Sequence, residues 1–61
     1  MSNPYDRAAT AAILKAVGRL TAAELAKTLH WPRTRVRLAL ADLEQQGDAH
    51  HNNDRTWERT K

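Results

Sequence analysis

Residues Leu20–Gly47 read LTAAELAKTLHWPRTRVRLALADLEQQG, and this stretch decides the fold. On both sides of a central His30-Trp31-Pro32, apolar residues recur at the three- and four-residue spacing of a helix. Proline disfavours helical geometry in the residue before it, so the helical pattern is interrupted there. The stretch therefore predicts two helices, over residues 21–29 and 32–46, joined by a tight turn.

The start of the first helix carries a capping box. Thr21 and Glu24 lie three residues apart, so the hydroxyl and the carboxylate can each accept a hydrogen bond from a backbone N–H that a helix start leaves unpaired. Leu20 and Leu25 flank the cap at the spacing of a hydrophobic staple. These signals predict that the helix starts at Thr21 and ends near Leu29.

The second helix is expected to begin at Pro32, because the missing N–H of proline is no loss in a first turn. Val36, Leu40 and Leu43 then form a buried face, together with Ala39. Gly47 suits a left-handed residue that ends the helix.

Arginines crowd the start of this second helix. At 100° per residue, Arg33 and Arg37 lie on one shoulder of the buried face, whereas Arg35 and Asp42 lie on the other. The side opposite the core carries Thr34, Leu38, Ala41 and Gln45. Cations at a helix N-terminus oppose the helix dipole, which indicates a functional demand. Short outward residues between guanidinium groups favour insertion into a DNA major groove, which is about 12 Å wide.

The N-terminal segment predicts a further helix over residues 4–17. Asn3 is placed to cap it, Pro4 suits its first position, and Gly18 ends it. Its expected core face comprises Ala9, Ala12, Ile13, Ala16 and Val17. Leu14 and Tyr5 lie partly outside that face, and two interpretations remain open: they complete the edge of the core, or they join a homodimer surface.

The tail changes character at Asp48. Asn52-Asn53-Asp54 is a strong turn signal between two short polar segments, and it predicts a two-stranded β-hairpin over residues 48–60. Alternation along the second strand turns Trp57 toward the helices. Arg55, beside the turn, is the residue of the hairpin best placed to reach a phosphate or a minor groove.

Composition sets limits on the class of protein. The chain has 61 residues, which is one small domain over 1–61, and a domain of this size buries only about 60% of its unfolded surface. It has no Phe, so Trp31 and Trp57 are expected to supply much of the buried area. The net charge of +3 favours an anionic partner such as nucleic acid. The apolar runs are too short for a signal peptide or a membrane span, and we expect a cytoplasmic protein.

Several chemistries are disfavoured by the same sequence. There is no cysteine, and adjacent strand residues such as His50 and His51 point to opposite faces, so we expect no metal site. No phosphate loop or nucleophile motif occurs, so we expect neither catalysis nor a cofactor. Two plainer interpretations also remain: the arginines form a solvated face paired to Asp42 or Glu44, and Trp31 is a buried turn residue rather than a base-stacking platform.

Residues 8–60 resemble the bacterial winged helix-turn-helix transcription regulators, a group that includes the MarR-like and GntR-like families. The resemblance is carried by TAAELAKTL, by RTRVRLALADLEQQG and by the polar hairpin that closes on Trp57. It implies an α+β fold of three helices and a C-terminal wing, with the wing along the flanking backbone or minor groove. The second helix of the pair would be the recognition helix, and the residues implied to face the groove are Arg33, Thr34, Arg35, Arg37 and Leu38. Two positions depart from the pattern: His30 stands where Gly is common, and Pro32 replaces the usual capping Ser or Thr. Histidine tolerates positive φ better than most residues.

We therefore expect a sequence-specific, double-stranded DNA-binding transcription regulator of the small phage or plasmid type, which acts by occupancy. The candidate DNA contacts are Thr21, Lys27, Arg33, Thr34, Arg35, Arg37, Leu38, Asn53 and Arg55. The alternative is a winged-helix module that docks on a polymerase, a replication factor or a larger DNA-bound regulator through Leu38 and Ala41. A homodimer and a protein of the transcription machinery are the further partners considered. Binding of single strands or RNA is disfavoured, because the tryptophans are expected to be buried.

Overall fold

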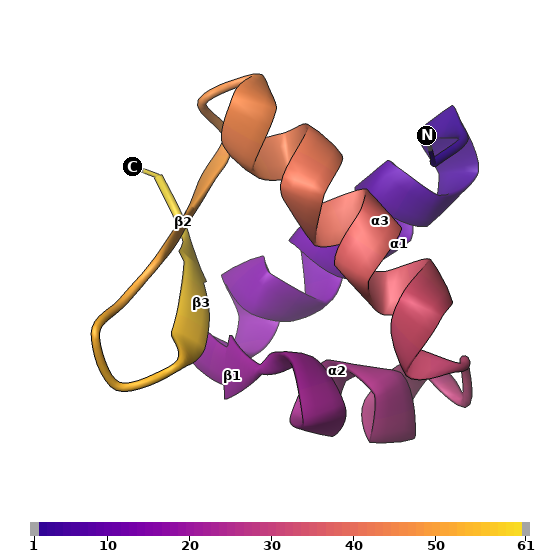
Figure 1. The fold of residues 1–61 in the computed structure, drawn as a ribbon, viewed down its shortest axis with the longest axis horizontal. Helices are drawn as coiled ribbons and strands as arrows, with labels where there is room; N and C mark the ends of the chain where they lie inside the picture. Colours follow the sequence, from indigo (N-terminus) through magenta and orange to yellow (C-terminus); the bar gives the residue numbers. More distant parts are fainter. Residues whose placement is uncertain (1, 61) are drawn as a thin grey trace.

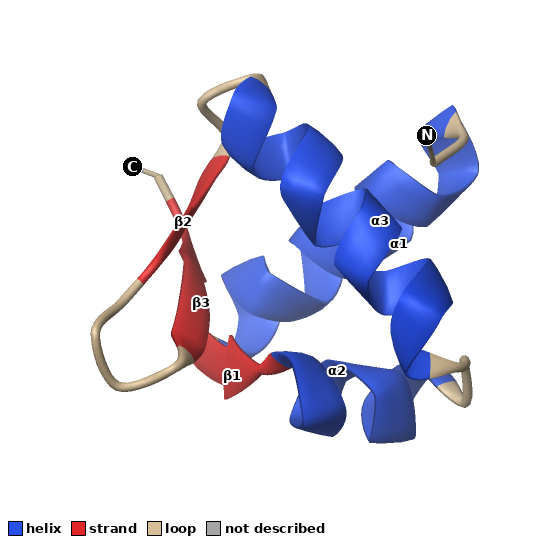
Figure 2. Ribbon diagram, viewed as in Figure 1, coloured by secondary structure: helices blue, strands red, loops and turns tan. Residues whose placement is uncertain are grey.

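The computed structural model describes residues 2–60, which form three helices and a small antiparallel sheet, an α+β fold (Figures 1 and 2). In chain order the elements are α1 (Pro4–Val17), β1 (Arg19–Thr21), α2 (Ala22–Leu29), α3 (Arg33–Gln45), β2 (Ala49–His51) and β3 (Thr56–Arg59). The three helices pack together, and the sheet lies at one side of them (Figure 2). None of the helices in the described residues is long and apolar enough to cross a membrane.

The sheet differs from the predicted two-stranded hairpin. The hairpin of β2 and β3 is present, but β3 also pairs with β1, so the strand order is β1-β3-β2. In this register Leu20 lies opposite Trp57, and Trp57 lies opposite His51 on its other side. The prediction missed β1 because the strand is only three residues long and its last residue, Thr21, is also the cap of α2. An extended backbone serves both purposes at Thr21.

The predicted capping box at the start of α2 is confirmed, with Thr21 as the cap, so the helix covers residues 22–29 rather than 21–29. The Thr21 hydroxyl accepts a hydrogen bond from the Glu24 N–H at 3.1 Å, and the Glu24 carboxylate accepts one from the Thr21 N–H at 2.8 Å. At the other end, His30 is left-handed with φ of 59°. The N–H of His30 donates to Lys27 and the N–H of Trp31 donates to Ala26, the pattern of a Schellman motif. His30 therefore occupies the left-handed position that glycine usually occupies at the end of a helix.

The bounds of α3 require a small correction. Pro32 has ψ of 149°, so it precedes the helix as its cap, and α3 covers residues 33–45 rather than 32–46. Pro32 makes no side-chain capping bond. At the far end Gly47 has φ of 81°, as predicted, and donates its N–H to the Glu44 carbonyl while Asp48 donates to Leu43. These two bonds again form a Schellman motif.

The bounds and caps of α1 are confirmed, but its predicted core face is correct only in part: Ile13 packs against the core. Asn3 accepts a hydrogen bond from the Asp6 N–H at 2.7 Å, and Gly18 ends the helix with φ of 105°. The buried residues of α1 are Asp6, Thr10 and Leu14. Ala12, Ala16 and Val17, which were expected in the core, are exposed.

The reason for this rotation of α1 lies in a polar contact: Asp6 faces α3, where it binds Arg35. Leu14, two turns after Asp6 on the same face, is consequently 1% exposed and belongs to the core. Tyr5 is 71% exposed, so it does not complete the core edge. A pattern of apolar residues alone could not reveal that a carboxylate marks the inner face of this helix.

The core is aliphatic. Its buried members are Leu14, Leu25, Ala26, Val36, Leu40, Leu43 and Ala49, contributed by all three helices and by β2. Trp31 and Trp57 are only half-buried and pack against this cluster, so the expectation that they supply much of the core overstates their burial. They instead cover the ends of the core at the turn before α3 and at the sheet.

Candidate functional site

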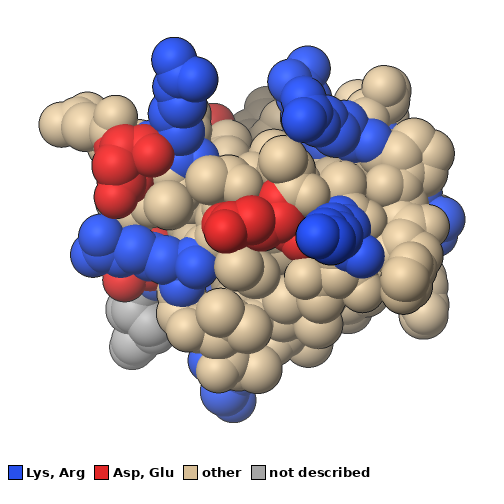
Figure 3. Space-filling model, turned by 90° about the horizontal axis from the view of Figure 1, so that it is seen from below, with Lys and Arg blue, Asp and Glu red and all other residues tan. Residues whose placement is uncertain are grey.

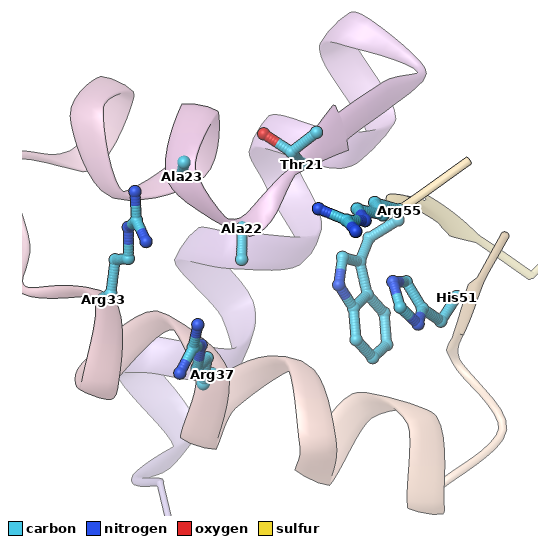
Figure 4. Close-up of a pocket in the computed structure, with 8 residues that line it drawn as sticks. Thr21, Ala22, Ala23, Arg33, Arg37, His51 and Arg55 are labelled. Atoms are coloured by element: carbon cyan, nitrogen blue, oxygen red, sulfur yellow. The ribbon is translucent and has the colours of Figure 1, made fainter. Parts of the chain in front are cut away.

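An open hollow of about 600 Å³ lies where the N-terminus of α2, the first two turns of α3 and the hairpin meet (Figure 4). It is lined by Thr21, Ala22, Ala23, Arg33, Arg37, His51, Arg55 and Trp57. Because three of these side chains are arginines from two separate parts of the chain, we call it the arginine hollow.

Two of the arginines come from α3. Arg33 and Arg37 are one turn apart, on the shoulder of the helix that the wheel predicted, and both are exposed. Burial of Val36 and Leu40 fixes the rotation of α3, which leaves the arginines no position in the core. In Figure 4 both side chains rise from α3 toward the first turn of α2.

The third arginine comes from the hairpin turn. Arg55 is left-handed with φ of 72°, and its N–H donates to the Asn52 carbonyl at 3.2 Å. The N–H of Asn52 in turn donates to the Thr56 carbonyl at 2.8 Å. In a hairpin loop of this form the left-handed position favours glycine. An arginine there stores backbone strain, which is common where a side chain has a task outside the fold.

A stacked pair of rings forms the hairpin side of the hollow. His51 on β2 and Trp57 on β3 are cross-strand neighbours, and their ring centroids are 4.6 Å apart with an angle of 18° between the planes. The imidazole is exposed and the indole is half-buried against the core. The sequence predicted that Trp57 faces the helices, but His51 was not assigned to any site. The hairpin register places the two residues side by side.

The charge of the hollow is uniformly positive. None of its lining residues is acidic. The first turn of α2 adds the positive end of its helix dipole. The acid in this first turn, Glu24, accepts the capping hydrogen bond from the Thr21 N–H. The hollow thus has the electrostatics of a site for an anion.

Outside the hollow, charges of both signs are mixed. Figure 3, which looks onto the side of α2 and β1, shows basic groups spread around acidic ones. On the sheet, Arg19 pairs with Asp54 at 3.7 Å and with Glu58 at 3.9 Å. The Thr56 hydroxyl and N–H donate to Asp54 and hold the pKa of that carboxyl below its ordinary value. The acids of the hairpin are therefore bound locally, and they do not line the hollow.

Arg35 lies apart from the other arginines. Its Nε and Nη2 donate to the two carboxylate oxygens of Asp6 at 2.9 and 2.8 Å, and its guanidinium lies 3.9 Å from the centre of a Trp31 ring. The bidentate bond from Arg35 holds the pKa of Asp6 below its ordinary value. Arg35 therefore fits the plainer interpretation of the α3 arginines, in which they form ion pairs within the fold. Its partner is Asp6 rather than the expected Asp42 or Glu44.

Asp42, on the same shoulder as Arg35, is also bound to the N-terminal segment. The N–H and the hydroxyl of Ser2 both donate to one of its carboxylate oxygens, at 2.8 and 2.7 Å. The hydroxyl bond is the main reason why the pKa of Asp42 lies below its ordinary value. Arg7 adds a longer ion pair at 3.7 Å. One shoulder of α3 is therefore used to bind α1, and the other faces the hollow.

Of the remaining predicted contacts, only Thr21 lines the hollow. Thr34 and Leu38 are exposed on the outer face of α3, and Leu38 is 43% exposed. Lys27 is exposed on α2, and Asn53 is exposed in the hairpin turn. Thr21 lines the hollow but its hydroxyl accepts the capping bond. Within residues 2–60, no three histidine, aspartate or glutamate side chains gather where they could hold a metal ion.

Comparisons of the chain with models of known protein families, with curated proteins and with solved structures found no match.

Proposed function

We propose that this chain is a winged helix-turn-helix protein that binds double-stranded DNA and regulates transcription by occupancy, as small phage- or plasmid-type regulators do. The observation that supports it best is the convergence of Arg33, Arg37 and Arg55 on one acid-free hollow. Two of these cations stand on a helix whose outer face is exposed, and the third stands on a hairpin beside it. A groove-binding helix and a backbone-binding wing require this arrangement.

In the proposed complex α3 enters the major groove. Its outer face offers Thr34 and Leu38, both exposed, and neither blocks a close approach to base edges. Arg37 stands next to them, where a guanidinium can bind a guanine edge with two hydrogen bonds, and Leu38 can meet a thymine methyl. Arg33, nearer the helix start, would bind a phosphate.

The hairpin is the proposed wing. Arg55 would neutralise a phosphate from the side of the turn, and Asn53 would contact the backbone beyond it. Pairing of β3 with β1 connects this wing to the residues that start α2, so its position is defined by the same sheet that bounds the hollow. Lys27 would supply a further phosphate contact from α2.

Arg35 is not among the proposed DNA contacts. Its Nε and Nη2 donate to the two carboxylate oxygens of Asp6 and its guanidinium lies over Trp31, so binding a phosphate through these atoms would break a contact between α1 and α3. These contacts within the fold explain the position of the Arg35 side chain without a bound ligand.

The proposal is tested by fluorescence anisotropy with a labelled DNA duplex over a series of salt concentrations. Arg37→Ala is expected to weaken binding by about 1–3 kcal/mol if the side chain reads a base. Lys15→Ala is the matched control, because it removes one exposed cation of α1 that does not line the hollow. Equal affinity of the Arg37 and Lys15 variants would count against the assigned role, and absence of binding to every duplex at low salt would refute the proposal.

The second candidate function is docking on a protein partner, and the 43% exposure of Leu38 on α3 favours it. The two functions differ in their response to salt. Binding to DNA through several cations weakens log-linearly as salt rises, whereas an apolar contact centred on Leu38 is less sensitive. Leu38→Ser would abolish such protein docking while the salt dependence of DNA binding stays as it is.

A further inference from the structure

The two neighbouring histidines of β2 have opposite surroundings. The Nε2 atom of His50 lies 3.4 Å from a carboxylate oxygen of Glu58, and its Nδ1 atom lies 3.1 Å from the Thr60 hydroxyl. His51 faces the other side of the sheet, where it lines the arginine hollow. One histidine thus has an acid for a partner, and the other stacks on Trp57 and lines a hollow that no acidic residue lines.

The residues that line the hollow together with His51 come from every element that meets there. From β3, Trp57 stacks on the imidazole. The turn contributes Arg55, and α3 contributes Arg33 and Arg37. From the start of α2 come Thr21 and the first backbone N–H groups, which carry the positive end of the helix dipole. None of the residues that line the hollow carries a negative charge to balance a proton on His51.

We propose that His51 is a fourth cationic contact of this hollow, and that it takes up a proton when a DNA phosphate binds there. This inference rests on the proposed function. A phosphate bound in the hollow would bring a negative charge close to His51, which favours the imidazolium, and both ring N–H groups could then act as donors to phosphate oxygens.

The stack on Trp57 makes His51 suitable for this task. An indole face attracts a cation, so it does not penalise the charged ring. Parallel stacking on Trp57 also restrains the plane of the imidazole (Figure 4). A flexible lysine at the same position would supply a permanent charge but no dependence on pH.

The test is the affinity for a labelled random-sequence duplex at about pH 8 and about pH 6, the range in which imidazoles titrate. Salt is held constant, and the wild-type chain is compared with His51→Gln and His50→Gln. The wild type is expected to bind about twofold to fivefold more tightly at the lower pH, the effect of one exposed ion pair. The His50 variant should keep this gain, and the His51 variant should lose it.

A second measurement follows the imidazole proton resonances of His51 by NMR with and without the duplex. The midpoint of its titration should move to higher pH in the complex, and that of His30 should stay where it is. Wild-type affinity that does not change with pH, or a gain that persists in His51→Gln, would overturn the inference while leaving the salt-dependent DNA binding intact. Absence of duplex binding at either pH would overturn both proposals.

Discussion

The substitution Arg55→Gly is expected to change the stability of the fold and the affinity for DNA in opposite directions. Arg55 has φ of 72°, a conformation that costs an ordinary residue about 1–2 kcal/mol and glycine nothing. Glycine loses more backbone freedom on folding than arginine does, which offsets about 0.5–1 kcal/mol of this gain in stability. The variant is therefore expected to be more stable by about 0.5–1 kcal/mol, a rise in melting temperature of about 2–8 °C for a domain of this size.

The same substitution removes one cation of the arginine hollow, and its effect on DNA binding has the opposite sign. Loss of one phosphate contact makes the negative slope of log K against log salt less steep by about 0.9. At about 0.1 M salt this corresponds to an affinity about eightfold weaker, or about 1.2 kcal/mol. Arg55→Lys is the matched control: it keeps the charge and the backbone strain, so both affinity and melting temperature should stay close to wild type.

Thermal unfolding by circular dichroism and anisotropy titrations at several salt concentrations measure the two effects on the same protein samples. A glycine variant that melts at a higher temperature yet binds more weakly would separate the role of the side chain from the integrity of the hairpin. A variant with wild-type affinity and salt slope would refute the assignment of Arg55 to a phosphate. A lower melting temperature would show that the arginine side chain stabilises the turn, contrary to the argument from φ.

Two further predictions concern stability. The pKa of Asp6 lies below its ordinary value of 3.8 because Arg35 donates hydrogen bonds to the carboxylate. The folded chain therefore binds a proton at Asp6 less readily than the unfolded chain does. The resulting stability is present above about pH 4 and is lost as the pH falls toward the folded-state pKa. Asp6→Asn should therefore melt several degrees lower at neutral pH and lose less stability between neutral pH and acid than the wild type, and an identical acid profile for the two proteins would contradict this. Thr21→Ala removes the hydroxyl that accepts the Glu24 N–H and should cost about 1 kcal/mol, whereas Thr21→Ser should cost little. Equal melting temperatures for the Ala and Ser variants would show that the hydroxyl contributes nothing to the start of α2.

Local signals predicted the helices well. Each helix boundary is set by a few neighbouring residues: Asn3 and Gly18 bound α1, and the box of Thr21 and Glu24 opens α2. Gly47 ends α3 through its positive φ. These features act over three or four residues, so they are visible in the sequence without knowledge of the tertiary structure.

Contacts between distant residues were not visible in this way. The inward face of α1 depends on the pairing of Asp6 with Arg35, which are 29 positions apart. The third strand exists because Leu20 meets Trp57 across the sheet. A pattern of apolar residues carries no information about a buried ion pair, so it did not reveal that Asp6 faces inward and binds Arg35.

For the candidate site, the sequence placed Arg33 and Arg37 correctly on one shoulder of α3, because that depends only on helical periodicity. It also singled out Arg55 beside the turn. His51 was missed as a lining residue, since its place beside the arginines depends on the register of the hairpin and on the way in which the sheet packs on α3.

Pairing of β1 with β3 has a consequence for the time at which the hollow forms during synthesis. β1 precedes α2, but its partner strand is β3, after all three helices in the chain. A nascent chain that has released only residues up to Gly47 holds the three helical segments but lacks Arg55, His51 and the strand that pairs with Leu20. The arginine hollow therefore does not exist on the ribosome until residues 55–59 have emerged, and truncated translation products that end before β3 lack the site altogether.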